Sequence, residues 1–162
     1  MQPFIPERAI FIHGLEGNSQ GVKASLLRRL YPSMLIPDFP GSLAERMQRL
    51  EQITADLDGW TLIGSSLGGL MAAIFTCRHP SQVRKQILLA PALIWPEFSA
   101  NLPEAVDTPT VVYHGTRDTL IPLASVQAIC QKIFTTLEFN VVDDDHGLYQ
   151  TVNQINWRTL LS

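Results

Sequence analysis

The sequence predicts an α/β protein in which parallel strands alternate with helices. Short apolar runs are separated by stretches in which apolar residues recur at helical spacing, a pattern typical of strands joined by crossover helices. Several runs are apolar without interruption, as expected for strands that helices cover on both faces. We therefore expect a three-layer α/β/α sandwich with about six mainly parallel strands. The length of 162 residues favours one domain over residues 1–162.

The predicted strands are short and evenly distributed along the chain. The uninterrupted apolar runs near residues 90 and 112 are the candidates for central strands. The second run ends at Pro37. The six strands are expected at residues 9–12, 34–36, 60–63, 86–90, 110–113 and 137–142.

Helical spacing marks the segments between these strands. Ser42 and Glu45 stand three residues apart, as in a capping box, and the helix that they open presents apolar residues from Leu43 to Leu57. A closing helix carries apolar residues from 148 to 160. Three further helices are expected at 22–30, from 67 to about 79, and at 122–133.

Composition and charge exclude several classes of protein. Apolar residues make up 46% of the chain and charged residues 17%, which favours a folded core over disorder. The net charge is −3 and no basic cluster is present, so we expect no nucleic-acid partner. No apolar run approaches the roughly 18 residues of a membrane span, and no signal-peptide pattern is found. We expect a cytoplasmic protein that does not insert into membranes and keeps Cys77 and Cys130 reduced.

A glycine-rich turn between the third strand and its helix carries the strongest chemical signal. Its sequence, Gly64-Ser65-Ser66-Leu67-Gly68, fits Gly-x-Ser-x-Gly with Ser66 at the centre. Glycines two residues before and after the serine remove side chains that would collide where a strand turns sharply into a helix. Ser66 is the candidate nucleophile, and the N–H of Leu67 is a candidate oxyanion donor. The alternative is that the glycines serve only a tight turn and close packing.

The loop after the first strand offers a second oxyanion donor. It starts with His13-Gly14-Leu15 at the carboxyl ends of the strands, where open α/β sheets bind ligands. We predict that the N–H of Leu15 is this donor and that Gly14 gives the backbone of this loop room.

Four histidines compete for the role of the base that activates Ser66. His13 precedes the oxyanion loop, His79 follows the helix of the nucleophile, and His114 ends a strand, so each has a structural explanation. His146 follows the last strand at the edge that carries Ser66, and we predict that it is the base. The alternative for His146 is a solvated loop residue.

Asp118 is the predicted acid of the site. It lies between nucleophile and base, in the chain order of serine, acid and histidine that accompanies this serine turn, and it follows the strand 110–113. The competing run 143–145 adjoins His146 on one short loop and is poorly placed to reach its ring. That run also lacks the spacing of a calcium loop, so we expect no metal.

Four sequence landmarks together resemble the α/β-hydrolase superfamily. They are 11–14, 64–69, 114–118 and 145–147, and the resemblance spans residues 8–161. The small size and the stretch from His13 through Ser19, Lys23 and Ala24 are similar to small lidless YqiA-like bacterial esterases. The resemblance implies a Ser66-Asp118-His146 triad, acyl transfer through an acyl-enzyme, no cofactor, and activity on carboxylic esters or thioesters.

The predicted substrate is a small-molecule ester or thioester with a small or short-chain acyl group. Residues 91–107 stand where larger superfamily members insert a lid, and they are long enough for only one or two short turns. We expect a monomer or weak homodimer. Transfer of the acyl group to an acceptor other than water, and a catalytically idle scaffold that binds a small ligand or a protein, remain as alternatives. The predicted pocket, whose residues have packing under loops as the alternative explanation, comprises Gly14, Phe39, Leu93, Trp95, Phe98 and Leu120.

Overall fold

A parallel five-stranded sheet runs through the computed structural model, which describes residues 2–162. The strands lie side by side in chain order, and each neighbouring pair is parallel. The predicted alternation of parallel strands and helices is confirmed. The strands are β1 (Ala9–Ile12), β2 (Trp60–Ser65), β3 (Val83–Leu89), β4 (Thr110–Gly115) and β5 (Leu137–Val142).

The predicted sixth strand is reduced to a single bridge. Leu35 pairs in parallel with Ile10 beside β1, and its N–H donates to the carbonyl of Ala9 at 2.9 Å. Pro37 follows two residues later and has no N–H, so the pairing does not extend. The chain passes from β1 to Leu35 on one side and then to β2 on the other. The loops after β1 and β2 therefore diverge at the sheet edge where α/β proteins bind ligands.

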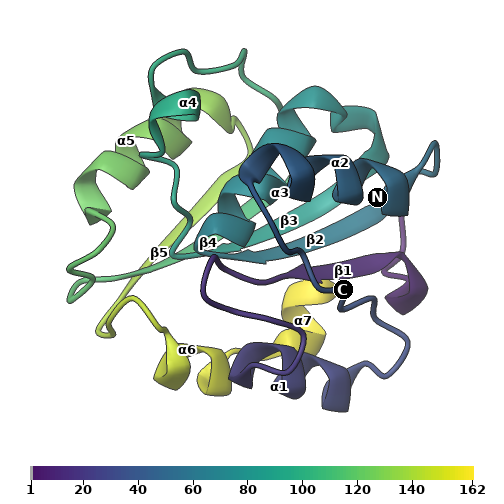
Figure 1. Ribbon diagram of the computed structural model, residues 1–162. Coiled ribbons are helices and arrows are strands. Elements are labelled where there is room, and N and C mark those ends of the chain that lie inside the picture. Colours follow the sequence, from purple (N-terminus) through teal and green to yellow (C-terminus); the bar gives the residue numbers. More distant parts are fainter. Residues whose placement is uncertain (1) are drawn as a thin grey trace.

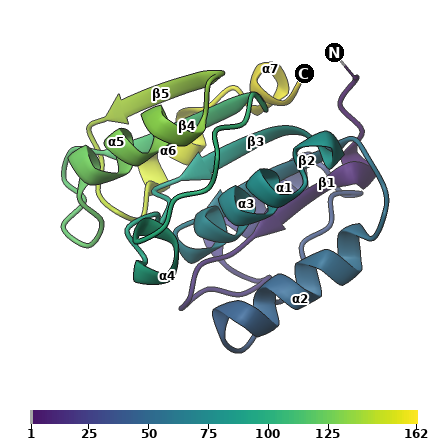
Figure 2. The ribbon, with the colours of Figure 1, turned by 90° about the horizontal axis from the view of Figure 1, so that it is seen from above.

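Helices cover both faces of the sheet, as Figures 1 and 2 show, so the predicted three layers are confirmed. Each face carries its own cluster of buried apolar side chains. On one face lie α2 (Leu43–Thr54), α3 (Leu67–Arg78), α4 (Pro96–Ser99) and α5 (Leu123–Ile133). On the other lie α1 (Val22–Leu30), α6 (Tyr149–Gln154) and α7 (Trp157–Leu161). The short 3-10 helices Pro6–Arg8 and Pro80–Gln82 each precede a strand.

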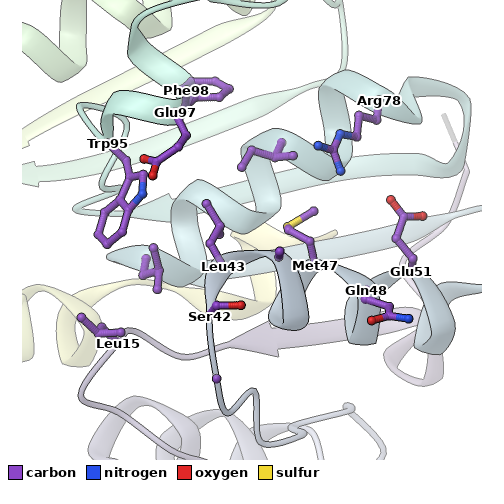
Figure 3. A pocket seen from close by; sticks show the side chains of 14 residues that line it. Leu15, Ser42, Leu43, Met47, Gln48, Glu51, Arg78, Trp95, Glu97 and Phe98 are labelled. Carbon is purple, nitrogen blue, oxygen red and sulfur yellow. The ribbon is translucent and has the colours of Figure 1, made fainter.

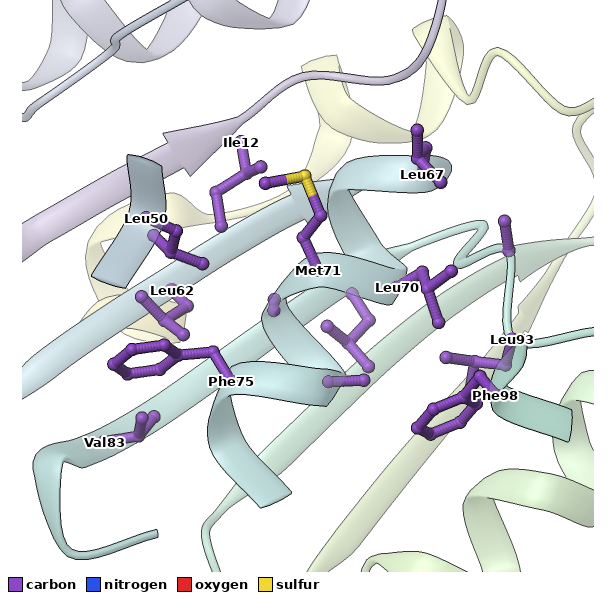
Figure 4. Packing of buried hydrophobic residues seen from close by; sticks show 14 of the residues in the cluster. Ile12, Leu50, Leu62, Leu67, Leu70, Met71, Phe75, Val83, Leu93 and Phe98 are labelled. Carbon is purple, nitrogen blue, oxygen red and sulfur yellow. The ribbon is translucent and has the colours of Figure 1, made fainter. Parts of the chain in front are cut away.

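Helix α3 lies deepest in the molecule and holds the predicted nucleophile at its start. Its side chains Leu70, Met71 and Phe75 are completely buried and pack with Ile12 and Leu62 of the sheet (Figure 4). Burying a side chain of this size contributes about 2 kcal/mol. Such packing leaves the helix little freedom to move and fixes the position of the turn that precedes it.

The predicted ends of several helices and strands are wrong. Helix α2 ends at Thr54, because Ala55 turns the chain with a positive φ of 46°, and Leu57 is exposed beyond it. Strand β3 begins at Val83, three residues earlier than predicted. The prediction missed this start because the charged residues after Val83 interrupt the apolar run. The closing helix is broken into two, since Asn156 caps α7 by accepting a hydrogen bond from the N–H of Thr159.

The segment 91–107 forms no large lid, as predicted from its length. Its only helix is the four-residue α4, and Val106 then joins Phe134 through an isolated bridge. Across residues 2–162, no helix has both the length and the apolarity to cross a membrane.

Candidate active site

Ser66 occupies a strained backbone position between β2 and α3. Its φ of 55° and ψ of −115° are unusual for a residue with a side chain. Its N–H donates to the carbonyl of Leu89 at 2.9 Å, which ties the turn to β3. A Cβ on Gly64 would stand 2.6 Å from the carbonyl carbon of Gly68, closer than real Cβ atoms come. The glycine spacing is therefore required by the turn.

His146 lies beside this hydroxyl, on the loop after β5. Its Nε2 is 3.0 Å from Oγ of Ser66, and its Nδ1 is 2.7 Å from Oδ2 of Asp118. An ionised carboxylate only accepts hydrogen bonds, so Nδ1 carries the ring proton and Nε2 is left to accept the proton of Ser66. The side chain of His146 is 23% exposed, while that of Asp118 is fully buried.

The carboxylate of Asp118 is held by the backbone of its own loop. Its Oδ1 accepts from the N–H groups of Leu120 at 2.9 Å and Ile121 at 2.8 Å. The N–H of Arg117 donates to the carbonyl of Asp144, which joins this loop to the loop of His146. Oδ2 is thus the oxygen that faces the imidazole. The structure brings together the three residues predicted as nucleophile, acid and base, from the ends of three different strands.

His114 forms a further buried contact with Asp118. Its Nε2 is 2.9 Å from the carbonyl oxygen of Ile121 and 3.3 Å from Oδ2 of Asp118, and both side chains are fully buried. Its Nδ1 is buried without a hydrogen-bond partner among the described residues. Burial lowers the pKa of His114, against the opposing effects of the Ile121 hydrogen bond and the Asp118 charge. We infer a neutral imidazole whose proton sits on Nε2.

The run 143–145, the alternative source of the acid, is occupied elsewhere. Asp143 is exposed and pairs with Arg117 at 3.0 Å, and Asp145 accepts from the N–H of Gly147. Asp144 is buried and accepts from the N–H and the hydroxyl of Thr151 at 2.9 and 2.8 Å. Burial raises the pKa of Asp144, but its hydrogen bonds from Thr151 and Asp145 outweigh that effect and the net pKa is lowered. Asp144 thereby anchors the loop of His146 to α6.

No cluster suited to a metal ion occurs in the part of the chain that the structure describes. Groups of three or more His, Cys, Asp or Glu side chains that could ligate a cation are absent from residues 2–162. His79 instead pairs with Glu51 of α2 at 2.9 Å. His79 therefore has the structural role that its position after α3 suggested.

The two backbone N–H groups predicted as oxyanion donors have no acceptor among residues 2–162. The N–H of Leu67 is the first of α3, where no intrahelical partner exists, and the N–H of Leu15 lies in the loop after β1. Gly14 packs against the nucleophile, since a Cβ there would lie 3.3 Å from Cβ of Ser66. The roles of Leu15 and Leu67 as oxyanion donors remain predictions.

The loop that carries Leu15 is held by two side chains that the sequence did not single out for this purpose. His13 accepts from the N–H of Phe39 through Nε2 at 2.9 Å, so its Nδ1 donates to the carbonyl of Gly14 at 2.7 Å. Arg46 of α2 donates to the carbonyls of Gly14 and Leu15. No motif surrounds Arg46, and only its position beside Met47 on the buried side of α2 distinguishes it from the exposed Arg49.

A groove of about 790 Å³ starts at the proposed oxyanion donors and runs between α2, α3 and α4 (Figure 3). Apolar side chains line most of it, including Leu15, Leu67 and Trp95. Glu51 and Arg78 border the end farthest from Leu15, and Glu97 stands beside Trp95 (Figure 3). No member of the Ser66-Asp118-His146 group lines the groove.

The predicted pocket residues lie in different places, and Gly14, which packs against Ser66, does not line the groove. Trp95 and Phe98 line the groove. Phe39 and Leu93 are completely buried, because they fill the core under the loops. Leu120 is 68% exposed and lies outside the groove. Apolar residues on loops therefore do not by themselves identify the pocket lining, because core packing and pocket lining use the same kinds of side chain.

A family model matches most of the chain. Residues 9–127 match the model described as Uncharacterised protein family (UPF0227). These residues include β1 to β4 and the turn of Ser66. No curated protein matches the chain.

Solved structures match nearly the whole length. A protein from Xanthomonas campestris, assigned to the α/β superfamily of hydrolases, shares 28% identity at a TM-score of 0.74, with 94% of this chain and 95% of that chain covered. Est1E from Butyrivibrio proteoclasticus shares 16% identity at a TM-score of 0.70, with 95% and 88% covered.

A third structure, the monoacylglycerol lipase of Paleococcus ferrophilus, shares 15% identity at a TM-score of 0.71, with 99% and 97% covered. The predicted resemblance to the α/β-hydrolase superfamily is confirmed. The chain therefore has the α/β-hydrolase fold and belongs to the YqiA-like family UPF0227.

Proposed function

We propose that this protein is a serine hydrolase that cleaves carboxylic esters or thioesters of small or short-chain acyl groups. The observation that carries the proposal is the chain of two hydrogen bonds, 3.0 and 2.7 Å long, that links Ser66 through His146 to the buried Asp118. A serine hydroxyl becomes a strong nucleophile when an adjacent, oriented base accepts its proton.

In the first half-reaction Oγ of Ser66 attacks the acyl carbonyl carbon while Nε2 of His146 takes the hydroxyl proton. The carbonyl oxygen becomes an oxyanion that the N–H groups of Leu15 and Leu67 stabilise. The bond to the leaving group breaks, and His146 gives its proton to the departing oxygen or sulfur. Water then attacks the acyl-enzyme by the same route, which releases the acid and restores Ser66.

The groove supports the assignment of the acyl side. The leaving group must lie within reach of Nε2 of His146, which receives and returns the proton. The groove is lined by Leu15 and Leu67 but by none of the three reacting side chains, so it suits the acyl substituent. Glu51 and Arg78 border the far end of the groove, and Glu97 lies beside Trp95. A long alkyl chain in the groove would lie against these charged side chains. This arrangement favours a small or short acyl group.

The test is intact-mass analysis after treatment with a fluorophosphonate, which phosphonylates an activated serine as fluoride leaves. We expect one adduct on the wild type and none on Ser66→Ala or His146→Ala. Ser65→Ala is the matched control, because Ser65 is the buried neighbour of the nucleophile and should leave labelling unchanged. Hydrolysis of p-nitrophenyl esters and acyl thioesters of increasing chain length then defines the substrate. A folded wild type without an adduct would contradict the proposal and favour a binding module.

A further inference from the structure

Arg46 is a buried cation whose position costs stability. The residue is 3% exposed, and among the described residues it forms no ion pair. It stands in the first turn of α2, where the helix dipole disfavours positive charge. Glu45, its neighbour, is engaged in the capping box with Ser42. Burial lowers the pKa of Arg46, but a guanidinium remains charged at neutral pH.

The guanidinium donates only to backbone carbonyls. Nε is 3.2 Å from the oxygen of Gly41, Nη1 is 3.4 Å from that of Gly14, and Nη2 is 3.2 Å from that of Leu15. The carbonyl of Gly14 also accepts from His13 and from the N–H of Gly17. Among residues 2–162, only Arg46 donates to the carbonyl of Leu15. It is also the only residue of α2 that donates to either of these two carbonyls.

These two carbonyls flank the N–H of Leu15. The peptide joining Gly14 to Leu15 is trans, so its C=O and N–H point in opposite directions. A donor that holds the Gly14 oxygen on the side of α2 turns the Leu15 N–H to the other side. Gly14 packs on Ser66, because a Cβ added to Gly14 would lie 4.0 Å from Oγ of Ser66.

We propose that Arg46 is a positioning residue of the oxyanion hole, which fixes the direction of the Leu15 N–H by holding the carbonyls on both sides of it. The inference rests on the proposed function, because it assigns a task to one of the two oxyanion donors. This role also gives a reason for a buried cation without an acidic partner in the first turn of α2. Its positive charge near the loop further favours the negative charge that develops on the substrate oxygen.

The experiment compares Arg46→Met with Arg49→Met. Met fills a similar volume without a charge or a donor, and Arg49 is an exposed arginine on the same helix that donates to the carbonyl of Asp38. Hydrolysis of p-nitrophenyl acetate is measured for both, and active sites are counted by fluorophosphonate titration. We expect Arg46→Met to lower kcat per titrated site about 100-fold, the scale of a displaced reacting group, with little change in KM. Arg49→Met should leave both unchanged.

A transition-state analogue separates positioning from folding. A trifluoromethyl ketone adds to Ser66 and places an oxyanion in the hole, so its Ki should rise in Arg46→Met by the factor by which kcat/KM falls. Arg46→Lys keeps the charge but not the planar fork, and we expect an intermediate loss of about 10-fold. It also serves as the test variant if Arg46→Met fails to fold.

The outcomes are distinct. A wild type that neither labels nor hydrolyses the ester overturns the proposed function and this inference with it. An active wild type with full kcat per site in Arg46→Met, an unchanged Ki, or an equal loss in Arg49→Met overturns the inference alone.

Discussion

The two halves of the candidate site are made from different parts of the polypeptide. The acid–base half consists of the side chains of Asp118 and His146, which β4 and β5 bring together at 2.7 Å. The proposed oxyanion half consists of backbone N–H groups, those of Leu15 and Leu67, so it does not depend on the chemistry of these two side chains. A single substitution can delete a side chain, whereas every substitution except one to proline keeps the backbone N–H and can only displace it. The two halves should therefore respond differently to mutation.

The largest expected effect is on the acid–base half. Asp118→Asn replaces an acceptor-only carboxylate by an amide that no longer selects the tautomer of His146, and kcat should fall about 10⁴-fold. Ester hydrolysis at saturating substrate measures it. Asp143→Asn, at an exposed carboxylate on the neighbouring loop, should retain full activity. A loss below tenfold in Asp118→Asn would contradict the assigned role.

The next effect concerns the backbone that carries the oxyanion half. In Gly68→Ala the new Cβ would overlap the carbonyl oxygen of Ile12, a rigid backbone atom of β1. We expect a loss in the free energy of unfolding of about 3 kcal/mol, measured by urea denaturation. In Gly17→Ala the nearest atom is Cβ of His13 at 3.2 Å, and the loss should stay below about 1 kcal/mol. Equal losses would mean that the two turns are equally constrained.

The smallest effect is a pH dependence of stability at the support of Asp118. The pKa of His114 is lowered from 6.5 in the folded protein, so the unfolded chain takes up a proton first as the pH falls. The stability from neutral His114 is therefore present above pH 6.5 and is lost as the pH drops toward the folded pKa. Urea unfolding at pH 8, 6.5 and 5 should show wild type losing more of its free energy of unfolding than His114→Gln as the pH falls. Parallel pH curves would refute a neutral buried His114.

Much of the fold could be predicted because its physical causes are local. Continuous apolar runs gave the buried strands, and the spacing of Ser42 and Glu45 located the start of α2, where both capping hydrogen bonds are present. The ends were less predictable. Leu57 continues the apolar pattern of α2 but lies beyond its end, since a pattern does not reveal where the backbone turns.

The candidate site divides in the same way. Ser66 could be located because glycine spacing records a steric requirement of one turn. Asp118 and His146 could be assigned because parallel strands bring their carboxyl ends to one edge. The lining of the pocket was predictable only in part. Trp95 borders the groove, whereas Leu93, another apolar residue of the segment 91–107, is buried in the core.

The sequence by itself predicted the candidate reacting side chains and the order of elements that brings them to one edge of the sheet. Tertiary structure alone brings together the groups that we propose to orient the backbone donors. Arg46 lies 32 residues from Gly14 in the chain, and only the packing of α2 on α3 brings its guanidinium to that carbonyl. Local patterns record the constraints of a single turn, whereas the direction of a peptide N–H depends on groups that the folded chain assembles from distant segments.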